Sequence, residues 1–432
     1  MRKQVAVPVF TCLLFGSLFS VAQEPDQVTA EKLAGAHPHT ISRAAQAKAI
    51  PAISTQNSTN TTASTQASTI PGVDTITTFN GSFRTPGFDS NGNPNSKWYY
   101  TMVGRSPEHE GTTRFHAPII PVSIDLRNAD GSPRFVNGQR LFYDARQYVR
   151  LVLNSPIFQN YKYDSSKRPT QFTDAVQRAE FGHEAEDEWH TLLNPDVKRG
   201  RVMTLLQGTY QFALNADGTC CAFVLVDESA FSNALFPPTY PVDNTTVIGA
   251  AELAGDMTTQ DITTLLFPNT YLYAPGDPSN CCVLGFHSFD FEPGVPSNGN
   301  QLRFYVMNYS SWISPGLFGD AFVDVTAVSH ELSETFNDPL VVYDGVHGLT
   351  PWWLAPNGLC QDNLETGDVI EGLPNATFPI TMNGYTYHPQ NEALLPWFEF
   401  KTHPHSIHGA YSYPDTTVVT ALSPVEKAGC AP

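Results

Sequence analysis

Basic residues are scarce in this chain, and long apolar runs are absent beyond residue 22. Lys and Arg number 24 against 42 Asp and Glu, which gives a net charge of -18. A nucleic-acid-binding protein neutralises phosphates with Lys and Arg, so this balance argues against such a partner. A membrane helix needs about 18 uninterrupted apolar residues. We therefore expect no nucleic-acid partner and no membrane-spanning helix in the mature chain.

The first 22 residues have the pattern of a secretory signal peptide. Arg2 and Lys3 precede an apolar stretch over residues 5–19, and residues 20–22 (SVA) match the small-x-small pattern of signal peptidase. Removal of this segment leaves 22 basic residues against 42 acidic ones, a net charge of -20. We predict a secreted protein that is extracellular or periplasmic and soluble.

Cysteine is also sparse, and no Cys-x-x-Cys spacing is present. The mature chain retains six cysteines: Cys220, Cys221, Cys281, Cys282, Cys360 and Cys430. An even number in an oxidising compartment predicts disulfides. Adjacent side chains on a strand point to opposite faces, so we expect Cys220 and Cys221 to bond separate partners, at least one of them in the 281/282 pair. A four-cysteine zinc site is the weaker alternative.

Composition changes near residue 76. Residues 23–75 are rich in Ala, Ser, Thr, Gln and Asn, which predicts a disordered linker or pro-segment. Residues 76–432 suffice for one large domain or two lobes. Runs such as KWYYTMVG, APIIPVSIDLR and QLRFYVMNY predict strands, and Asp-Gly in RNADGSP and LNADGTC predicts tight hairpins. Because residues 170–193 and 319–337 have helical periodicity, we predict an α+β fold, mostly antiparallel β with packed helices.

The second helical segment contains the motif His-Glu-x-x-Glu. With the helix starting at Gly319 and Asp320, its apolar residues share one side, and His330 and Glu334 lie one turn apart on the other, beside Glu331. Zinc peptidases place two ligands four residues apart on a helix, and the glutamate after the first ligand acts as general base. The alternative is that these residues are solvated charges on the outer face of an amphipathic helix.

A metal site needs a third protein ligand. The polar, Gly-containing loop DNLETGDVIEG supplies Glu365 and Asp368, about thirty residues beyond Glu334. A carboxylate at such a distance completes the coordination sphere in one clan of zinc peptidases. Glu365 is therefore our first candidate for the third ligand, and Asp368 is the second.

These residues resemble a known pattern. Residues 330–334 (HELSE), 337–341 (NDPLV) and 365–368 (ETGD) are similar to segments of uncharacterised secreted bacterial proteins. They are more distantly similar to the plant phosphate-induced, EXORDIUM-like family, whose motif reads His-Glu-Leu-Ala-Glu, then Asn-Pro-Leu-Val, then Glu-Ile-Gly-Asp. The match covers residues 329–372. It departs from the family at residues 369–370 (VI), where the family tends to place a cysteine.

The resemblance implies a zincin-like core of the gluzincin type. His330, Glu334 and either Glu365 or Asp368 would be the metal ligands, and Glu331 would stand in the position of the base. Two carboxylates and one imidazole leave a Zn²⁺ site with no formal charge, so the pKa of a bound water is lowered less than beside two imidazoles. Oxygen-rich ligation also suits Mn²⁺ or Ca²⁺. We expect Zn²⁺, with Mn²⁺ or Ca²⁺ as alternatives.

Other histidines offer weaker candidates. The segment FGHEAEDEWH places His183 and Asp187 one helical turn apart, although a solvated helix end is the alternative. We expect His287 to be a packed histidine that at most lines a cleft. The segment KTHPHSIHGAYSY has three histidines in what reads as an exposed turn, His403, His405 and His408.

We therefore predict a secreted metal-dependent peptidase that acts on extracellular protein or peptide. The alternative is a non-catalytic extracellular module that binds glycan or protein and keeps a metal ion for structure. Trp352 and Trp353 are candidates for a sugar-stacking surface in that case. The chain has no Gly-x-Ser-x-Gly elbow and no phosphate-binding glycine loop, so we expect neither serine-hydrolase nor nucleotide chemistry.

Overall fold

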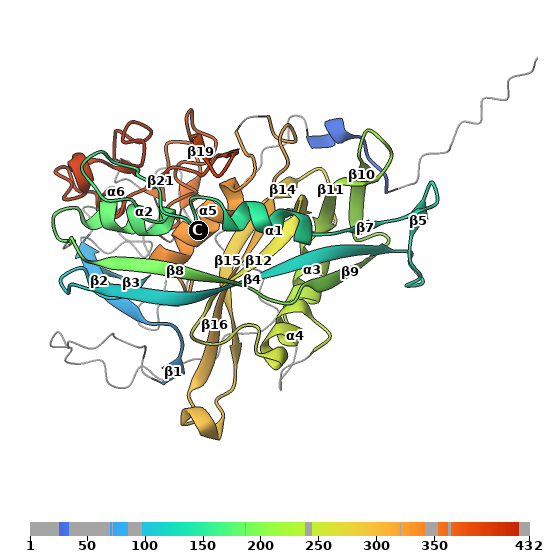
Figure 1. Ribbon diagram of the computed structural model, residues 1–432, viewed down its shortest axis with the longest axis horizontal. Helices are drawn as coiled ribbons and strands as arrows, with labels where there is room; N and C mark the ends of the chain where they lie inside the picture. The colour runs from blue at the N-terminus through green and yellow to red at the C-terminus, as the bar shows by residue number, and fades with distance from the viewer. Residues whose placement is uncertain are drawn as a thin grey trace, which may run out of the picture.

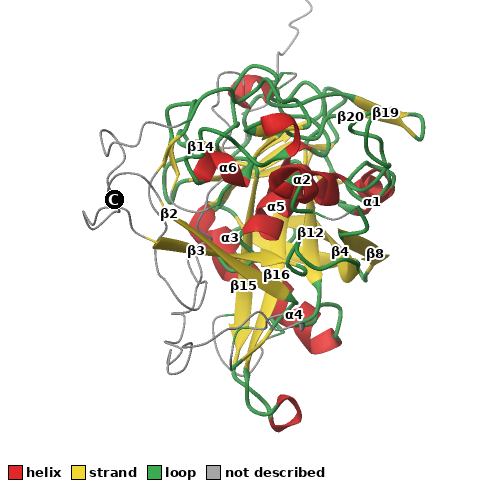
Figure 2. Cartoon of the chain, turned by 90° about the vertical axis from the view of Figure 1, so that its left-hand side faces the viewer, coloured by secondary structure: helices red, strands yellow, loops and turns green. Residues whose placement is uncertain are grey.

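The chain folds around two β-sheets with helices on both faces of the larger sheet (Figures 1 and 2). The computed structural model describes residues 26–33, 70, 72–84, 97–185, 187–237, 244–319, 321–341, 353–361 and 364–422. None of the helices in these ranges is long and apolar enough to cross a membrane.

The central sheet has eight strands, and most of its pairs are parallel. Along its main path the order is β1-β16-β12-β4-β7, with β15 paired to β16 and both β8 and β9 paired to β4. Only β15 with β16 and β7 with β4 are antiparallel among these pairs. The strands are β1 (Val73–Asp74), β4 (Thr112–Arg127), β7 (Phe142–Tyr143), β8 (His190–Val197), β9 (Arg201–Leu206), β12 (Ile262–Pro268), β15 (Gly285–Glu292) and β16 (Leu302–Trp312).

The prediction of a mostly antiparallel α+β fold is therefore wrong, and the architecture is α/β-like. The physical reason is that the inner strands are covered on both faces. Every residue of β12 and of β15 is buried. Strands buried on both sides are characteristic of parallel sheets flanked by helices.

A smaller sheet and five two-stranded sheets complete the β structure. The smaller sheet has the order β10-β11-β13-β14, and its β11–β13 pair is parallel. Its strands are β10 (Tyr210–Leu214), β11 (Cys220–Asp227), β13 (Thr270–Tyr273) and β14 (Cys281–Val283). The two-stranded sheets pair β2 (Thr78–Arg84) with β3 (Lys97–Val103), β5 (Phe135–Val136) with β6 (Gln139–Arg140), β17 (Trp353–Leu354) with β18 (Cys360–Gln361), β19 (Ile380–Met382) with β20 (Tyr385–Tyr387), and β21 (Glu392–Ala393) with β22 (Ser412–Tyr413).

The helices form layers on opposite faces of the central sheet. In Figure 1 α1, α2 and α5 lie on one side of it, and α3 and α4 lie on the other. The α-helices are α1 (Arg146–Leu153), α2 (Phe172–Phe181), α3 (Glu228–Leu235), α4 (Val247–Ala254), α5 (Thr326–Asn337) and α6 (Leu395–Phe398). The 3₁₀ helices are η1 (Ala30–Leu33), η2 (Pro296–Asn298) and η3 (Ile407–Gly409).

Alternation along β15 decides which side chains face α5. Phe289 and Phe291 belong to the same core as Val328 and Leu332 of α5, whereas Phe286 belongs to the core on the α3 side. Successive side chains of a strand point to opposite faces. His287, two residues before Phe289, is thus placed on the face that α5 covers.

Both helical segments are shorter than predicted. The first ends at Phe181, because Gly182 has φ 50° and a Cβ there would lie 2.1 Å from His405 O. The second begins at Thr326 and not near Gly319, because Asp324 has φ 44° and pairs with Ile313 as a β-bridge. Asp320, the predicted cap, lies outside the described residues.

Part of the predicted linker packs against the smaller sheet. Gln27 forms a parallel bridge with Phe212 of β10, and the side chain of Asp26 pairs with Arg134 at 2.7 Å. Leu33 of η1 is buried in the core formed with β11 and β13. Residues 26–33 thus add an edge segment to β10.

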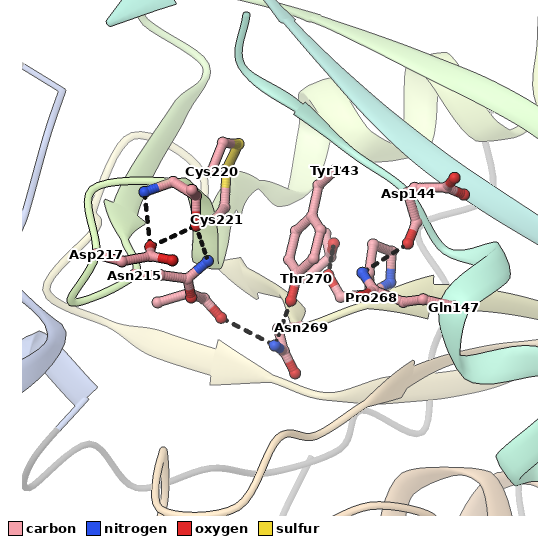
Figure 3. Close-up of a disulfide and its surroundings, with 12 residues drawn as sticks. Tyr143, Asp144, Gln147, Asn215, Asp217, Cys220, Cys221, Pro268, Asn269 and Thr270 are labelled. Carbon is pink, nitrogen blue, oxygen red and sulfur yellow. Dashed lines mark hydrogen bonds between the residues drawn. A yellow bond between two sulfur atoms is a disulfide. The ribbon is translucent and has the colours of Figure 1, made fainter. Parts of the chain in front are cut away.

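The cysteine pairs close on themselves. Cys220 bonds Cys221, and Cys281 bonds Cys282, so the predicted cross-link between the two pairs is wrong. Figure 3 shows the first disulfide near the turn between β10 and β11. The prediction assumed a regular strand, but the register shifts beside Cys220 and again beside Cys281. Cys360 is also disulfide-bonded, and Cys430 lies outside the described residues.

Candidate metal centre

The polar side of α5 is buried. His330, Glu331 and Glu334 are 1%, 0% and 2% exposed, and all twelve residues of the helix are classed as buried. Its apolar side packs on β15 and β16 through residues such as Val328 and Leu332. The interpretation of these three residues as solvated charges on an outer face is therefore wrong.

The loop around residues 364–368 closes over α5 and orients Glu334. The backbone N–H groups of Gly367 and Asp368 donate to Glu334 Oε1 at 3.1 and 3.2 Å. Gln390 holds the loop, since its Nε2 donates to Gly367 O at 2.7 Å while its backbone N–H donates to Ser329 Oγ of α5 at 2.9 Å. Glu334 is therefore fixed by backbone donors before any ligand binds.

Three of the predicted ligands meet at one point. His330 Nε2 lies 3.0 Å from Glu334 Oε1 and 3.3 Å from Asp368 Oδ1. Ligand atoms of these three residues all lie within 4.8 Å of one another. The prediction that the loop approaches the two helix residues is confirmed. The loop residue that lies beside His330 is Asp368. That these atoms bind a metal ion stays a prediction.

Glu365 belongs to the same cluster but faces another histidine. Its Oε2 lies 3.7 Å from His287 Nδ1, and Glu334 Oε2 and Glu331 Oε2 lie 3.4 and 3.7 Å from the same nitrogen. His287 and Glu365 are both 0% exposed. The expectation that His287 is a packed histidine that at most lines a cleft did not include its place in this cluster. The alternation His287, Phe289, Phe291 was the signal that could have placed it on the helix-covered face.

Several of these buried atoms have no hydrogen-bond partner among the described residues. They are both ring nitrogens of His287 and both carboxylate oxygens of Glu331 and of Glu365. Buried polar groups are almost always satisfied, and each exception needs an explanation. Imidazole nitrogens and carboxylate oxygens are the donors that Zn²⁺ and Mn²⁺ take in proteins. The residues present therefore fit a divalent cation.

Burial and opposite charges shift the pKa values in this cluster. Burial raises the pKa of Glu331 to about 7, and it raises the pKa of Glu365 well above its usual range. Burial acts in the same direction on Glu334, but His330 and His287 outweigh it and hold the pKa of Glu334 well below its usual range. Burial lowers the pKa of both imidazoles, yet the facing carboxylates raise it well above the usual value. The cluster is thus a network of strongly interacting charges.

The other histidine segments do not form such a cluster in the described residues. His183 is exposed in a turn beyond the end of α2, whereas His190 lies on β8 and pairs with Asp174 at 2.8 Å. His405 faces Glu399 at 3.9 Å, and His408 pairs with Asp164 at 2.5 Å. The side chains of His190, His405 and His408 are thus engaged in separate local pairs.

Trp353 is part of the core and not of a surface. It is 0% exposed, and its Nε1 donates to Phe398 O at 2.9 Å. Trp352 lies outside the described residues. Trp353 is therefore not a sugar-stacking platform in this structure.

No family model matches this chain, and no curated protein or solved structure matches it at a significant level. The resemblance to the EXORDIUM-like family and to the zincin pattern therefore stays a prediction. The chemistry of the centre has to be argued from its own residues.

Proposed function

We propose that the chain is an exported metal-dependent hydrolase that cleaves peptide bonds in extracellular protein or peptide. The observation that carries the proposal is the burial of His330, Glu331 and Glu334 against further carboxylates. An uncompensated buried ion costs several kcal/mol. A bound divalent cation offsets this cost of burying the charges. Charged residues on a solvated helix face are not buried and do not carry that cost.

In this proposal His330, Glu334 and Asp368 hold the cation, with Zn²⁺ expected first and Mn²⁺ or Ca²⁺ as alternatives. When bound, the cation supplies Lewis acidity that polarises the carbonyl of the scissile bond. Glu331 follows the first ligand directly on α5 and acts as general base, accepting a proton from the attacking water on a carboxylate oxygen. The N–H groups of Gly367 and Asp368 keep Glu334 in its orientation.

Export is proposed from the signal-peptide pattern of residues 1–22, which lie outside the described residues. The closed cysteine pairs support it, because structural disulfides persist in oxidising compartments and are rare in the cytosol.

The variant Glu331→Gln tests the catalytic role. Glu331 is proposed to contact the water and not the cation, so the variant should keep its metal content by elemental analysis. Hydrolysis of an unfolded protein substrate should fall by about 100- to 10,000-fold, the usual contribution of a general base.

The control variant is His330→Ala, which removes a ligand. It should release metal and lower the unfolding temperature, since the binding free energy that stabilises the folded state is lost. Wild-type protein with stoichiometric metal but no hydrolysis that depends on Glu331 would contradict the proposal.

The second candidate is a non-catalytic extracellular module with a structural metal ion, which binds protein or glycan elsewhere on its surface. The observation that favours it is that the ligand atoms are almost fully buried, whereas a catalytic site keeps one open position for water or substrate. The two candidates differ at Glu331. In the module Glu331→Gln changes stability at most, because no reaction depends on it.

A further inference from the structure

Glu334 belongs to two groups of ligand atoms and uses a different oxygen in each. Its Oε1 lies 3.0 Å from His330 Nε2, and its Oε2 lies 3.4 Å from His287 Nδ1. The first group also contains Asp368, and ligand atoms of the second group, with Glu331, also lie within 4.8 Å of one another. Glu334 therefore lies between the two imidazoles, and a further set of ligand atoms on the His287 side consists of His287, Asp338 and Glu365.

The spacing around His287 fits a bound cation better than a set of hydrogen bonds. The carboxylate oxygens of Glu331, Glu334 and Glu365 lie 3.4–3.7 Å from His287 Nδ1. Hydrogen bonds between nitrogen and oxygen are about 2.7–3.2 Å long. Two ligands that each bind Zn²⁺ at about 2.0–2.2 Å, separated by a tetrahedral angle, are about 3.3–3.6 Å apart. The 3.4 Å distance to Glu334 lies within the second range and the two 3.7 Å distances lie just beyond it, whereas all three exceed the length of a hydrogen bond.

The unpartnered atoms support the same site independently. Both nitrogens of His287 and both oxygens of Glu365 are buried and have no hydrogen-bond partner among the described residues. A cation held only by His330, Glu334 and Asp368 leaves them unsatisfied. A second cation near His287 satisfies at least one donor atom of each.

The number of donors also suffices for two cations. Ligand atoms of His287, Asp338 and Glu365 lie within 4.8 Å of one another, and so do those of His330, Glu334 and Asp368. These two sets share no residue, so a cation in one set leaves the donors of the other available.

We propose that the centre binds two divalent cations, the first at His330, Glu334 and Asp368 and the second at His287, Asp338 and Glu365, each a set whose ligand atoms all lie within 4.8 Å of one another. The inference rests on the proposed function for its first site and adds the second. In two-metal hydrolases the cations lie about 3.5–4 Å apart and stabilise both the attacking and the leaving oxygen. Glu331 remains the base, and its Oε1 faces the backbone of Gly285.

The test is the number of cations bound by the full-length chain. Cation-free protein is titrated with Mn²⁺ alone and with Zn²⁺ alone in a calorimeter, and the bound metal is counted by elemental analysis. Wild-type protein should bind two equivalents. His287→Phe, which keeps the ring volume and removes the donors, should bind one, and so should Glu365→Gln.

Two control variants separate this result from a general effect on folding. Glu331→Gln makes the same chemical change as Glu365→Gln and should retain two equivalents. His183→Phe, at an exposed position, should also retain two. If His287→Phe does not fold, the comparison of the two glutamine variants still decides. If chelation unfolds the wild-type chain, the count is made on protein purified in Mn²⁺.

Electron paramagnetic resonance gives a second readout that is independent of activity. Two Mn²⁺ ions in these adjacent sites should give a spin-coupled spectrum, which His287→Phe reduces to that of isolated Mn²⁺. A wild-type stoichiometry of one, or two equivalents in both His287→Phe and Glu365→Gln, overturns the inference. Two cations without hydrolysis contradict only the proposed function. One cation with hydrolysis that depends on Glu331 contradicts only this inference.

Discussion

Two glycines leave room for the side chains of the centre. A Cβ at Gly367 would lie 2.4 Å from His330 Nδ1, and a Cβ at Gly285 would lie 2.5 Å from Glu331 Oε1. Separations of this size are far inside van der Waals contact. The loop and strand β15 can therefore approach the ligand residues of α5 only because these two positions lack a side chain.

The variant Gly367→Ala should displace the His330 ring. We expect a loss of about 1–3 kcal/mol in the free energy of unfolding, the usual cost of overpacking, and more than tenfold weaker binding of the first cation. Chemical denaturation and metal titration measure the two effects. Gly200→Ala is the control, since the nearest atom to its Cβ would be Pro121 O at 3.4 Å. Unchanged cation affinity in Gly367→Ala would show that the loop does not position His330.

At the scale of elements, the centre depends on the packing of α2 against α5. Asn337, the last residue of α5, donates a hydrogen bond from Nδ2 to Glu180 Oε1 on α2. Glu180 is fully buried, and burial raises its pKa to about 8. In the folded protein this carboxyl group therefore keeps its proton at a pH where it is ionised in the unfolded chain.

This difference makes stability depend on pH. Below about pH 4.5 Glu180 is protonated in both states and has no effect. As the pH rises towards 8, only the unfolded chain releases the proton, so the folded state loses stability. The variant Glu180→Gln keeps the acceptor for Asn337 and does not titrate. Its free energy of unfolding should equal that of the wild type near pH 4. Near pH 8 it should be higher by a few kcal/mol, at about 1.4 kcal/mol per pKa unit.

Denaturant unfolding of cation-saturated protein across this range measures the effect. Glu188→Gln is the control, because its carboxylate is exposed and pairs with Arg168, which is also exposed. If the free energy of unfolding changes with pH in the same way for the wild type and Glu180→Gln, Glu180 is ionised in the folded protein and the prediction is wrong.

The sequence predicted the residues of the centre better than the elements that hold it. The spacing of His330 and Glu334 needs only helical geometry over one turn, and that local rule applies wherever the helix begins. The start at Thr326 depends on the β-bridge between Asp324 and Ile313, a tertiary contact that periodicity does not contain. His287 was missed for the same reason, because its role depends on which strand α5 covers.

At the scale of the whole molecule, the parallel sheet brings distant segments to one place. Strand β15 supplies His287, α5 supplies His330 and Glu334, and the loop after β18 supplies Glu365 and Asp368. Figure 2 shows α5 lying over β15 and β16. The wrong expectation of an antiparallel fold depended in part on two Asp-Gly turns. Such a turn predicts a hairpin between the two strands it joins and does not predict how the other strands pair. Strand β12 (ITTLLFP), buried along its whole length, carried the contrary signal.

The most direct test of the central claim is anomalous diffraction from crystals of the full-length protein grown with Mn²⁺ or Zn²⁺, recorded on both sides of the absorption edge of that metal. A cation bound at the first site should give an anomalous peak about 2.0–2.2 Å from His330 Nε2 and from a carboxylate oxygen of Glu334. With two cations bound, a second peak should lie about 3.5–4 Å from the first, beside His287. Crystals grown at a saturating concentration of the metal that show no peak between α5, β15 and the loop at residues 364–368 would contradict the central claim.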